Sequence, residues 1–210
     1  MIEDSIPNFS KYKAVFSVLA GSGWGVILGI TGVTPLAYIA TYPEEWLNEY
    51  NTNHYAFTDP AFAWSLENRG YRRWSEIDID DPQEVMKKAK KFGLNFGAAF
   101  SISSAQSTER FHAFFCARPD RELENNELVH LMEHFAELVV GFENVSALTA
   151  SEKQCLFLIS RGYNQSQVAS KMEVSVETVK KRLSSARTAL QAENTIHAIS
   201  IAERRGIFTP

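Results

Sequence analysis

The first 143 residues alternate short apolar runs with amphipathic segments that open on Asp or Pro. The apolar runs are rich in β-branched and aromatic residues, and turn-forming residues bound them, so they predict five strands near 24–30, 36–41, 71–74, 96–103 and 110–117. Helical spacing and helix-start signals predict helices at 8–20, from Pro43, at 59–68, at 81–93 and at 122–145. We therefore expect an α+β fold, an α/β/α sandwich with a roughly five-stranded antiparallel sheet.

Residues 148–210 show helical spacing throughout. A capping box, Thr149-x-x-Glu152, opens a helix that ends at Gly162, and Asn164 and Ser175 are placed to cap two more helices. Along the third helix, apolar residues recur at spacings of three and four: Val176, Val179, Leu183, Ala186 and Leu190. A fourth helix over 195–205 completes a C-terminal all-α, four-helix unit in which we expect a helix-turn-helix.

The opposite side of that third helix carries cations and hydroxyls. Its residues are Glu177, Lys180, Lys181, Arg182, Ser184 and Arg187. The apolar stripe would hold the helix to its scaffold while these side chains contact phosphates and base edges. A small helical bundle that binds nothing is the plainer alternative, but the short helix, the tight turn and the cationic third helix occur together. The sequence thus predicts a double-stranded DNA operator as partner.

Charge divides along the same boundary. Residues from Ala147 onward hold nine Lys/Arg and five Asp/Glu, a net charge of +4, whereas the remainder holds 12 and 20, a net charge of −8. A small basic unit joined to an acidic one is typical of a DNA-binding domain with a separate sensor or assembly domain. We expect a sensor and dimerisation domain over 1–143, a linker over 144–147 and a DNA-binding domain over 148–210.

Other signals argue against metal, membrane and catalytic functions. The two cysteines, Cys116 and Cys155, lie far apart, which favours a reduced compartment, and the cytoplasm is expected. Glycines and a proline interrupt the apolar stretch 26–39, so no membrane span is predicted, and no signal-peptide pattern opens the chain. His130 and His134 lack an evident third metal ligand, and no nucleophile motif is present. We expect no metal, no cofactor and no enzyme activity.

The C-terminal motifs resemble those of LuxR-type transcription regulators. The matching positions are Leu148, Thr149, Glu152, Gly162, Val168, Ala169, Ser175, Thr178, Val179, Leu183 and the run Gly206-Ile207-Phe208. Two positions depart from the pattern: Asn164 replaces the usual Thr or Ser, and Arg182 replaces the common His. The first change preserves a helix cap, and the second would alter phosphate contacts or operator preference.

The front domain resembles the autoinducer-binding domain of the quorum-sensing branch of this family. The resemblance rests on Tyr42-x-x-x-Trp46-x-x-x-Tyr50, Asp59-Pro60, Trp74 and Gly97, and the βα alternation of a response-regulator receiver is missing. It implies an N-acyl-homoserine lactone as ligand. Trp46 would donate to the lactone carbonyl, Asp59 would accept the amide N–H, Tyr50 would donate to the acyl carbonyl, and Tyr42 and Trp74 would wall the ring.

Two features of the front domain leave alternatives open. The aromatic residues could be plain core residues, with Asp59 serving simply as a helix cap. Many relatives also carry a Ser or Thr on the last strand, where residues 111–116 show no hydroxyl, and His112 is a possible substitute. For the acyl tail the candidate contacts are Ile39, Phe57, Phe62 and Phe100.

These inferences predict a DNA-binding regulator that works as a homodimer on a two-fold symmetric operator, because one recognition helix reads too few base pairs. The helix at 122–145 is the candidate dimer contact, and the resemblance implies RNA polymerase as a further partner. Lactone binding would control dimerisation and operator binding. The alternative is a ligand-independent regulator or an anti-activator that forms mixed dimers.

Overall fold

The computed structural model describes residues 6, 9–32, 34–146, 148–190, 192–204 and 207–208, with the side chains at 144–146 and 204 excepted. The chain divides into two compact units, Ser10–Val139 and Met1–Phe9 with Val140–Pro210. The helix α5 (Asn125–Ser146) crosses this division, so residues 144–146 of the expected linker are helical. Residue 147 of that linker, like Gly206 of the C-terminal motif, lies outside the described residues.

The first unit is built on a five-stranded sheet in which every pairing is antiparallel, as predicted. Its strand order is β2-β1-β5-β4-β3, so the last two strands in sequence lie at or beside its centre. The strands are β1 (Gly23–Ile30), β2 (Ala37–Ala40), β3 (Gly70–Arg73), β4 (Phe96–Ser103) and β5 (Phe111–Arg118). The predicted strands differ from these at their ends by a residue or two, which is where strand assignment is least determined.

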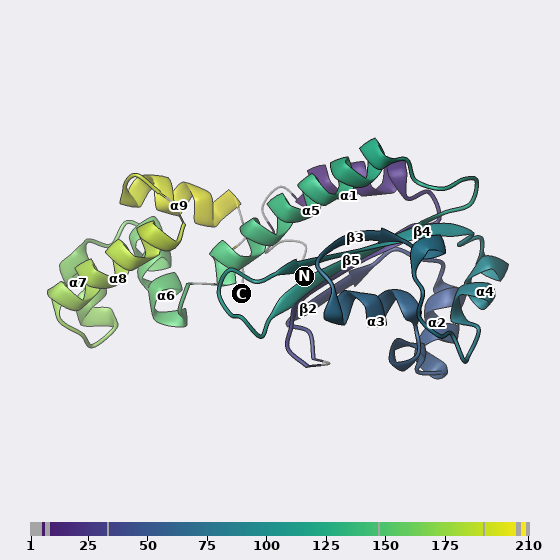
Figure 1. The fold of residues 1–210 in the computed structure, drawn as a ribbon. Helices are drawn as coiled ribbons and strands as arrows, with labels where there is room; N and C mark the ends of the chain where they lie inside the picture. Colours follow the sequence, from purple (N-terminus) through teal and green to yellow (C-terminus); the bar gives the residue numbers. More distant parts are fainter. Residues whose placement is uncertain are drawn as a thin grey trace. The chain divides into compact units, whose positions relative to one another are not determined.

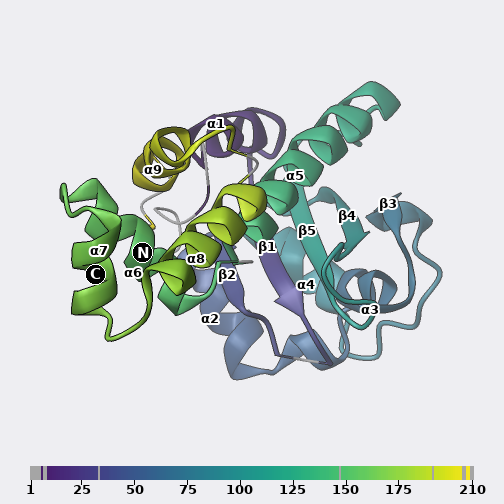
Figure 2. The same ribbon diagram turned by 90° about the vertical axis from the view of Figure 1, so that its left-hand side faces the viewer.

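Helices cover both faces of the sheet, which confirms the expected sandwich. Figures 1 and 2 show α1 (Phe9–Leu19) and α5 on one face and α2 (Glu44–Thr52), α3 (Pro60–Glu67) and α4 (Val85–Ala89) on the other. Successive residues of β5 serve opposite faces, because side chains alternate along a strand. The Phe114 ring packs against Phe16 of α1 and Phe135 of α5, at centroid distances of 4.4 and 5.6 Å, whereas Phe115 packs against Phe62 of α3 at 6.3 Å.

Two predicted boundaries are wrong for local reasons. The helix expected from Asp81 begins at Val85, because the Asp81 carboxylate accepts the N–H groups of Val85 at 2.7 Å and of Met86 at 3.0 Å from four and five residues away. It continues as a 3-10 turn, η4 (Lys90–Phe92), and ends at Gly93 with φ at +80°. The strand expected to include Trp74 stops one residue earlier, since Trp74 opens the 3-10 turn η3 (Trp74–Glu76).

In the second unit, α6 (Ala150–Ser160), α7 (Gln165–Lys171), α8 (Val176–Ala189) and α9 (Thr195–Arg204) form the predicted four-helix domain. Each predicted cap is present: the Thr149, Asn164 and Ser175 side chains accept backbone N–H groups at 3.2, 2.9 and 3.1 Å. The stripe of α8 is buried at Val179, Leu183, Ala186 and Leu190, where it joins Cys155, Leu156 and Val168 in one core. None of the helices among the described residues has the length and apolar character needed to cross a membrane.

Candidate functional site

A cavity of about 100 Å³ lies between the sheet and helices α2, α3 and α4. All five side chains expected at a ligand site line it: Tyr42, Trp46, Tyr50, Asp59 and Trp74. The fold brings them from separate segments, since Trp46 and Tyr50 stand four apart on α2 and share one face of that helix. Their rings meet edge to face at 5.6 Å, and Trp46 also packs against Phe92 at 5.5 Å.

Glycines on β1 make room for Tyr42. A Cβ added at Gly25 would lie 3.3 Å from the Tyr42 ring, and one added at Gly23 would lie 2.8 Å from the Tyr42 Cα. Gly23 also has φ at +118°, a conformation that side chains rarely adopt. Tyr42 therefore lies directly over the β1 backbone. Burial raises the pKa of its phenol well above the ordinary value, so the hydroxyl keeps its proton at neutral pH.

Gly97 on β4 does the same for Trp74, on the same face of the sheet. A Cβ at this position would come within 2.5 Å of the Trp74 ring and of the Cys116 carbonyl oxygen. The indole consequently packs directly against the β4 backbone at Gly97. Its Nε1 atom is buried and has no hydrogen-bond partner among the described residues. A buried donor without an acceptor costs free energy, so an acceptor on a bound molecule would stabilise this arrangement.

Asp59 combines a structural bond with a place in the cavity wall. One carboxylate oxygen accepts the N–H of Ala61 at 2.8 Å and so caps α3, and the other accepts the Tyr50 hydroxyl at 2.8 Å. Burial raises the pKa of Asp59, and the bonds from Tyr50 and the α3 backbone oppose that shift. Burial and the neighbouring Asp59 charge raise the pKa of Tyr50 well above its usual value. The carboxylate still has capacity to accept a further donor.

The Tyr50 proton is already engaged. A phenol has one proton to donate, and here it goes to Asp59 rather than into the cavity. Donation from Tyr50 to an acyl carbonyl, as the resemblance implied, would therefore require this bond to be exchanged on binding.

Tyr55 is a residue that sequence reasoning missed. Its buried hydroxyl donates to Glu49 at 2.9 Å and accepts from Lys88 at 2.8 Å, and its ring packs against Trp46 at 6.0 Å. The turn η2 (Tyr55–Phe57) thereby ties α2 to α4 behind the cavity. Nothing in the local pattern around Tyr55 distinguishes it from the other tyrosines.

Of the four residues expected to meet an acyl tail, Phe62 lines the cavity. Ile39 is not among the lining residues, and Phe57 is 77% exposed. Phe100 faces the opposite layer, where its ring lies 5.1 Å from that of Phe114. Three of these expectations were therefore wrong, because which side of the sheet or helix each residue occupies depends on register.

His112 cannot replace the missing hydroxyl. It is fully buried on the α1 and α5 side of β5, where its Nδ1 accepts the Gly29 N–H at 3.2 Å. The β5 residue that does reach the cavity is Phe115, and the other lining residues that the sequence did not single out include Tyr38 and Met86. The alternation Phe111, Ala113, Phe115 contained this signal, but it could be read only once the strand's facing was known.

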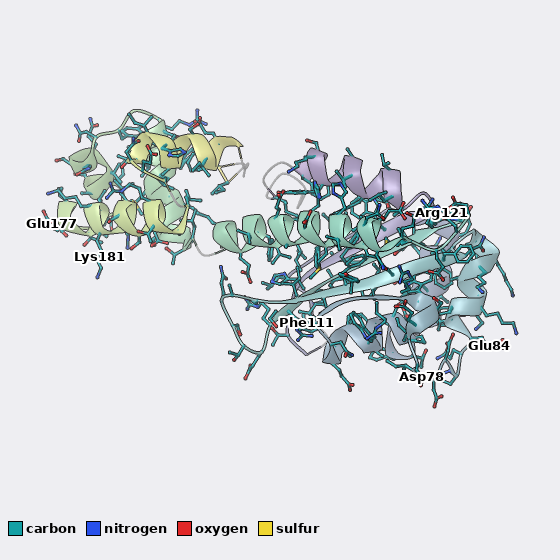
Figure 3. All side chains as sticks on the ribbon, turned by 45° about the horizontal axis from the view of Figure 1, so that its top comes forward. Asp78, Glu84, Phe111, Arg121, Glu177 and Lys181 are labelled. Atoms are coloured by element: carbon teal, nitrogen blue, oxygen red, sulfur yellow. The ribbon has the colours of Figure 1, made fainter. Side chains whose placement is uncertain are left out.

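A second candidate surface lies on α8. Five of the six residues expected to contact DNA line one hollow there, together with Gln165 of α7 and Thr195 of α9: Glu177, Lys180, Lys181, Ser184 and Arg187. Glu177 and Lys181 project outward from the helix (Figure 3). Lys180 forms an exposed ion pair with Glu177 at 2.8 Å.

The sixth residue, Arg182, does not line this hollow. It lies beside Cys155 of α6, where its charge and hydrogen bond oppose the burial that raises the pKa of that thiol. In the described residues, no group of three potential His, Cys, Asp or Glu metal ligands occurs.

Two protein families match the chain. The family described as "Autoinducer binding domain" matches residues 30–144, more than half of the chain, and "Bacterial regulatory proteins, luxR family" matches residues 146–202. Among similar proteins, the transcriptional activator AhyR of Aeromonas hydrophila is 25% identical over 186 residues, which cover 80% of this chain and 72% of AhyR.

Two further proteins extend the comparison. The quorum-sensing regulator RhlR of Pseudomonas aeruginosa is 23% identical over 184 residues, 80% of this chain and 74% of RhlR. The crystal structure of Escherichia coli SdiA aligns with a TM-score of 0.52 at 16% identity, covering 96% of this chain and 90% of SdiA. At that identity the likeness to SdiA concerns the fold.

Proposed function

This chain belongs to the LuxR-type quorum-sensing transcription regulators, which join an autoinducer-binding domain to a DNA-binding domain, and we propose that its signal is an N-acyl-homoserine lactone. The observation that carries the proposal is a buried carboxylate, Asp59, in the wall of a mostly apolar, aromatic-lined cavity. The carboxylate already accepts the Tyr50 hydroxyl and the Ala61 N–H, and its remaining lone pairs could accept one more donor from a ligand.

The polar groups of the cavity complement this class of molecule. In this proposal Asp59 would accept the amide N–H, and the indole N–H of Trp46 would donate to a carbonyl oxygen. The buried N–H of Trp74, which has no partner among the described residues, would be a further donor if binding exposes it. Tyr42 offers a flat wall for the lactone ring. A charge-assisted hydrogen bond of this kind contributes roughly 1.5–3 kcal/mol, enough to select an amide over an ester or a hydrocarbon.

Control of DNA binding would follow from mass action. A ligand that binds the folded state alone stabilises it by about 2.7 kcal/mol when its concentration is 100 times its Kd. We propose that lactone burial between the sheet and α2–α4 makes the folded first unit available for homodimerisation, and that the dimer places two α8 helices on a two-fold symmetric operator. Val129, which is 44% exposed on α5, is a candidate contact with the second copy.

Two observations favour a second function. The cavity is small, and β5 presents Phe115 rather than a hydroxyl to it. A regulator that has lost its signal, acting alone or by forming mixed dimers, would retain this fold with a shrunken cavity. Replacement of the cavity's polar residues would then leave its activity unchanged.

Thermal unfolding of the full chain with and without lactones separates the two functions. We expect at least one N-acyl-homoserine lactone to raise the melting temperature, and an ester analogue without the amide N–H to raise it less. Mass spectrometry of protein purified from cells supplied with lactones provides a second readout. If no lactone shifts the melt and none co-purifies, the ligand-independent function is favoured.

A further inference from the structure

The two ends of the cavity differ in chemistry. Trp46, Tyr42, Tyr50 and Trp74 belong to one packed cluster, which carries the cavity's indoles and two of its phenols. A second cluster around Ile30, Phe111 and Ala113 contributes Ile27, Phe62 and Phe115, none of which has a polar side-chain atom. Trp74 and Phe115 both pack against a third cluster around Ala61, Trp64 and Ala99, which joins the two ends. If the polar end holds the lactone and the amide, the acyl group must extend toward the apolar end.

Phe115 reaches this end from the middle of the sheet because its neighbours are small. Its partners across the two adjacent strands are Gly25 of β1 and Ala99 of β4, so no bulky side chain stands directly opposite the ring. The residues on either side of it in β5, Phe114 and Cys116, are completely buried, whereas Phe115 retains some exposure. On a central strand, that exposed surface is the part that faces the cavity.

The ring of Phe115 does not stand alone. It lies 6.3 Å from the Phe62 ring of α3, with the two planes at 48°, and both rings line the cavity at its apolar end. An acyl chain that continued past this point would have to displace one of the two rings. Protein interiors are close-packed, so such a displacement opposes binding.

We propose that Phe115 is a specificity-determining residue that restricts the ligand to a homoserine lactone with a short acyl group, butanoyl or hexanoyl in size. This inference rests on the proposed function and narrows its ligand. The cavity volume agrees with it, since about 100 Å³ is well below the roughly 300–1,000 Å³ of pockets that hold drug-sized molecules.

The test compares affinities for a series of lactones. The full chain, as wild type, Phe115→Leu and Phe115→Ala, is titrated calorimetrically with butanoyl-, hexanoyl-, octanoyl- and dodecanoyl-homoserine lactone. We expect the wild type to bind the butanoyl or hexanoyl compound at least tenfold more tightly than the dodecanoyl compound. In the opened cavity each additional buried methylene should strengthen binding about fourfold, which moves the optimum to octanoyl or longer.

Phe114→Leu is the matched control. It makes the same change one residue away on the opposite face of β5, where the ring packs against Phe16 and Phe135. It should lower the melting temperature without changing the order of lactone affinities. Phe115→Leu keeps most of the side chain. If Phe115→Ala does not fold, the lactone affinities of Phe115→Leu provide the test.

The outcomes distinguish a failure of this inference from a failure of the proposed function. A wild type that binds dodecanoyl-homoserine lactone as tightly as the hexanoyl compound overturns the inference and leaves the proposed function standing. The inference is also overturned, with the proposed function left standing, if the variants at position 115 keep the wild-type order of lactone affinities. A wild type that binds no lactone in the series overturns the proposed function itself.

Discussion

The Tyr50 hydroxyl donates a 2.8 Å hydrogen bond to the same Asp59 carboxylate that caps α3 through the Ala61 N–H. This pair joins α2 to α3 at the cavity wall, so one carboxylate holds the wall together and, in the proposed function, also accepts the ligand amide. Its functional and structural contributions can therefore be separated by substitutions that preserve one of them.

Asp59→Asn should keep the helix cap and lose the ligand. Asn is as good an N-cap as Asp, so we expect little change in the capping of α3. The bond to an amide N–H would no longer be charge-assisted, and the difference between a charged and a neutral hydrogen bond, about 1–1.5 kcal/mol, corresponds to about 5- to 13-fold weaker lactone binding. Titration of the purified variant measures this. Equal affinity in wild type and variant would show that the Asp59 charge does not contribute to lactone binding.

Asp59 should also make the stability of the ligand-free protein depend on pH. Burial raises its pKa in the folded state above the ordinary 3.8, so the folded state holds this proton more tightly than the unfolded state does. The resulting stability is fully present below about pH 3.8 and is lost as the pH rises through the folded-state pKa. Relative to Asp59→Asn, the wild type should therefore become less stable from pH 4 toward neutrality. Urea unfolding of both proteins across this range measures the difference between their free energies of unfolding. A difference that stays the same at every pH would contradict the prediction.

Gly97→Ala should disrupt the cavity from the sheet side. The new Cβ would meet the Trp74 ring and the Cys116 carbonyl at about 2.5 Å, so the indole must move. Overpacking of this kind costs about 1–3 kcal/mol, and the lactone-induced rise in melting temperature should disappear with it. Gly21→Ala is the control, because its Cβ would meet nothing closer than 3.8 Å. A normal ligand response in Gly97→Ala would show that the position of Trp74 is unimportant.

Lys181→Ala and Lys180→Ala should weaken operator binding without changing the thermal melt. Both residues line the hollow on α8, and each lost phosphate contact should reduce the slope of log affinity against log salt by about one. Lys91→Ala removes an equal charge from an exposed position on η4 and should leave the salt slope unchanged. Gel-shift titrations at several salt concentrations measure the slopes, and equal slopes for all four proteins would place the DNA contact elsewhere.

Arg182→Ala should behave differently from the lysine variants. Its side chain lies beside Cys155 of α6 rather than in the hollow. We therefore expect the variant to have a lower melting temperature and to bind DNA more tightly than Lys181→Ala does. A loss of binding as large as that of Lys181→Ala, at unchanged stability, would restore Arg182 to the recognition surface.

Local chemistry made much of this protein predictable. The caps at Thr149, Asn164 and Ser175 and the 3-4 spacing along α8 specify helices through contacts within a few residues, so their pattern is visible in sequence. The family resemblance predicted that Trp46 and Asp59 belong to one ligand site, and both residues line the same cavity in the fold.

What the sequence determined by itself was therefore the order and type of the elements and the polar end of the cavity. At its apolar end the sequence predicted Phe62, and the tertiary structure decided the rest: His112 and Phe100 turn toward α1 and α5, and Phe115 lines the cavity instead. The physical reason is that a strand's residues alternate between two faces, and a shift of one residue exchanges them. Which face looks onto the cavity is set by pairing with distant strands and by the helices packed on each side.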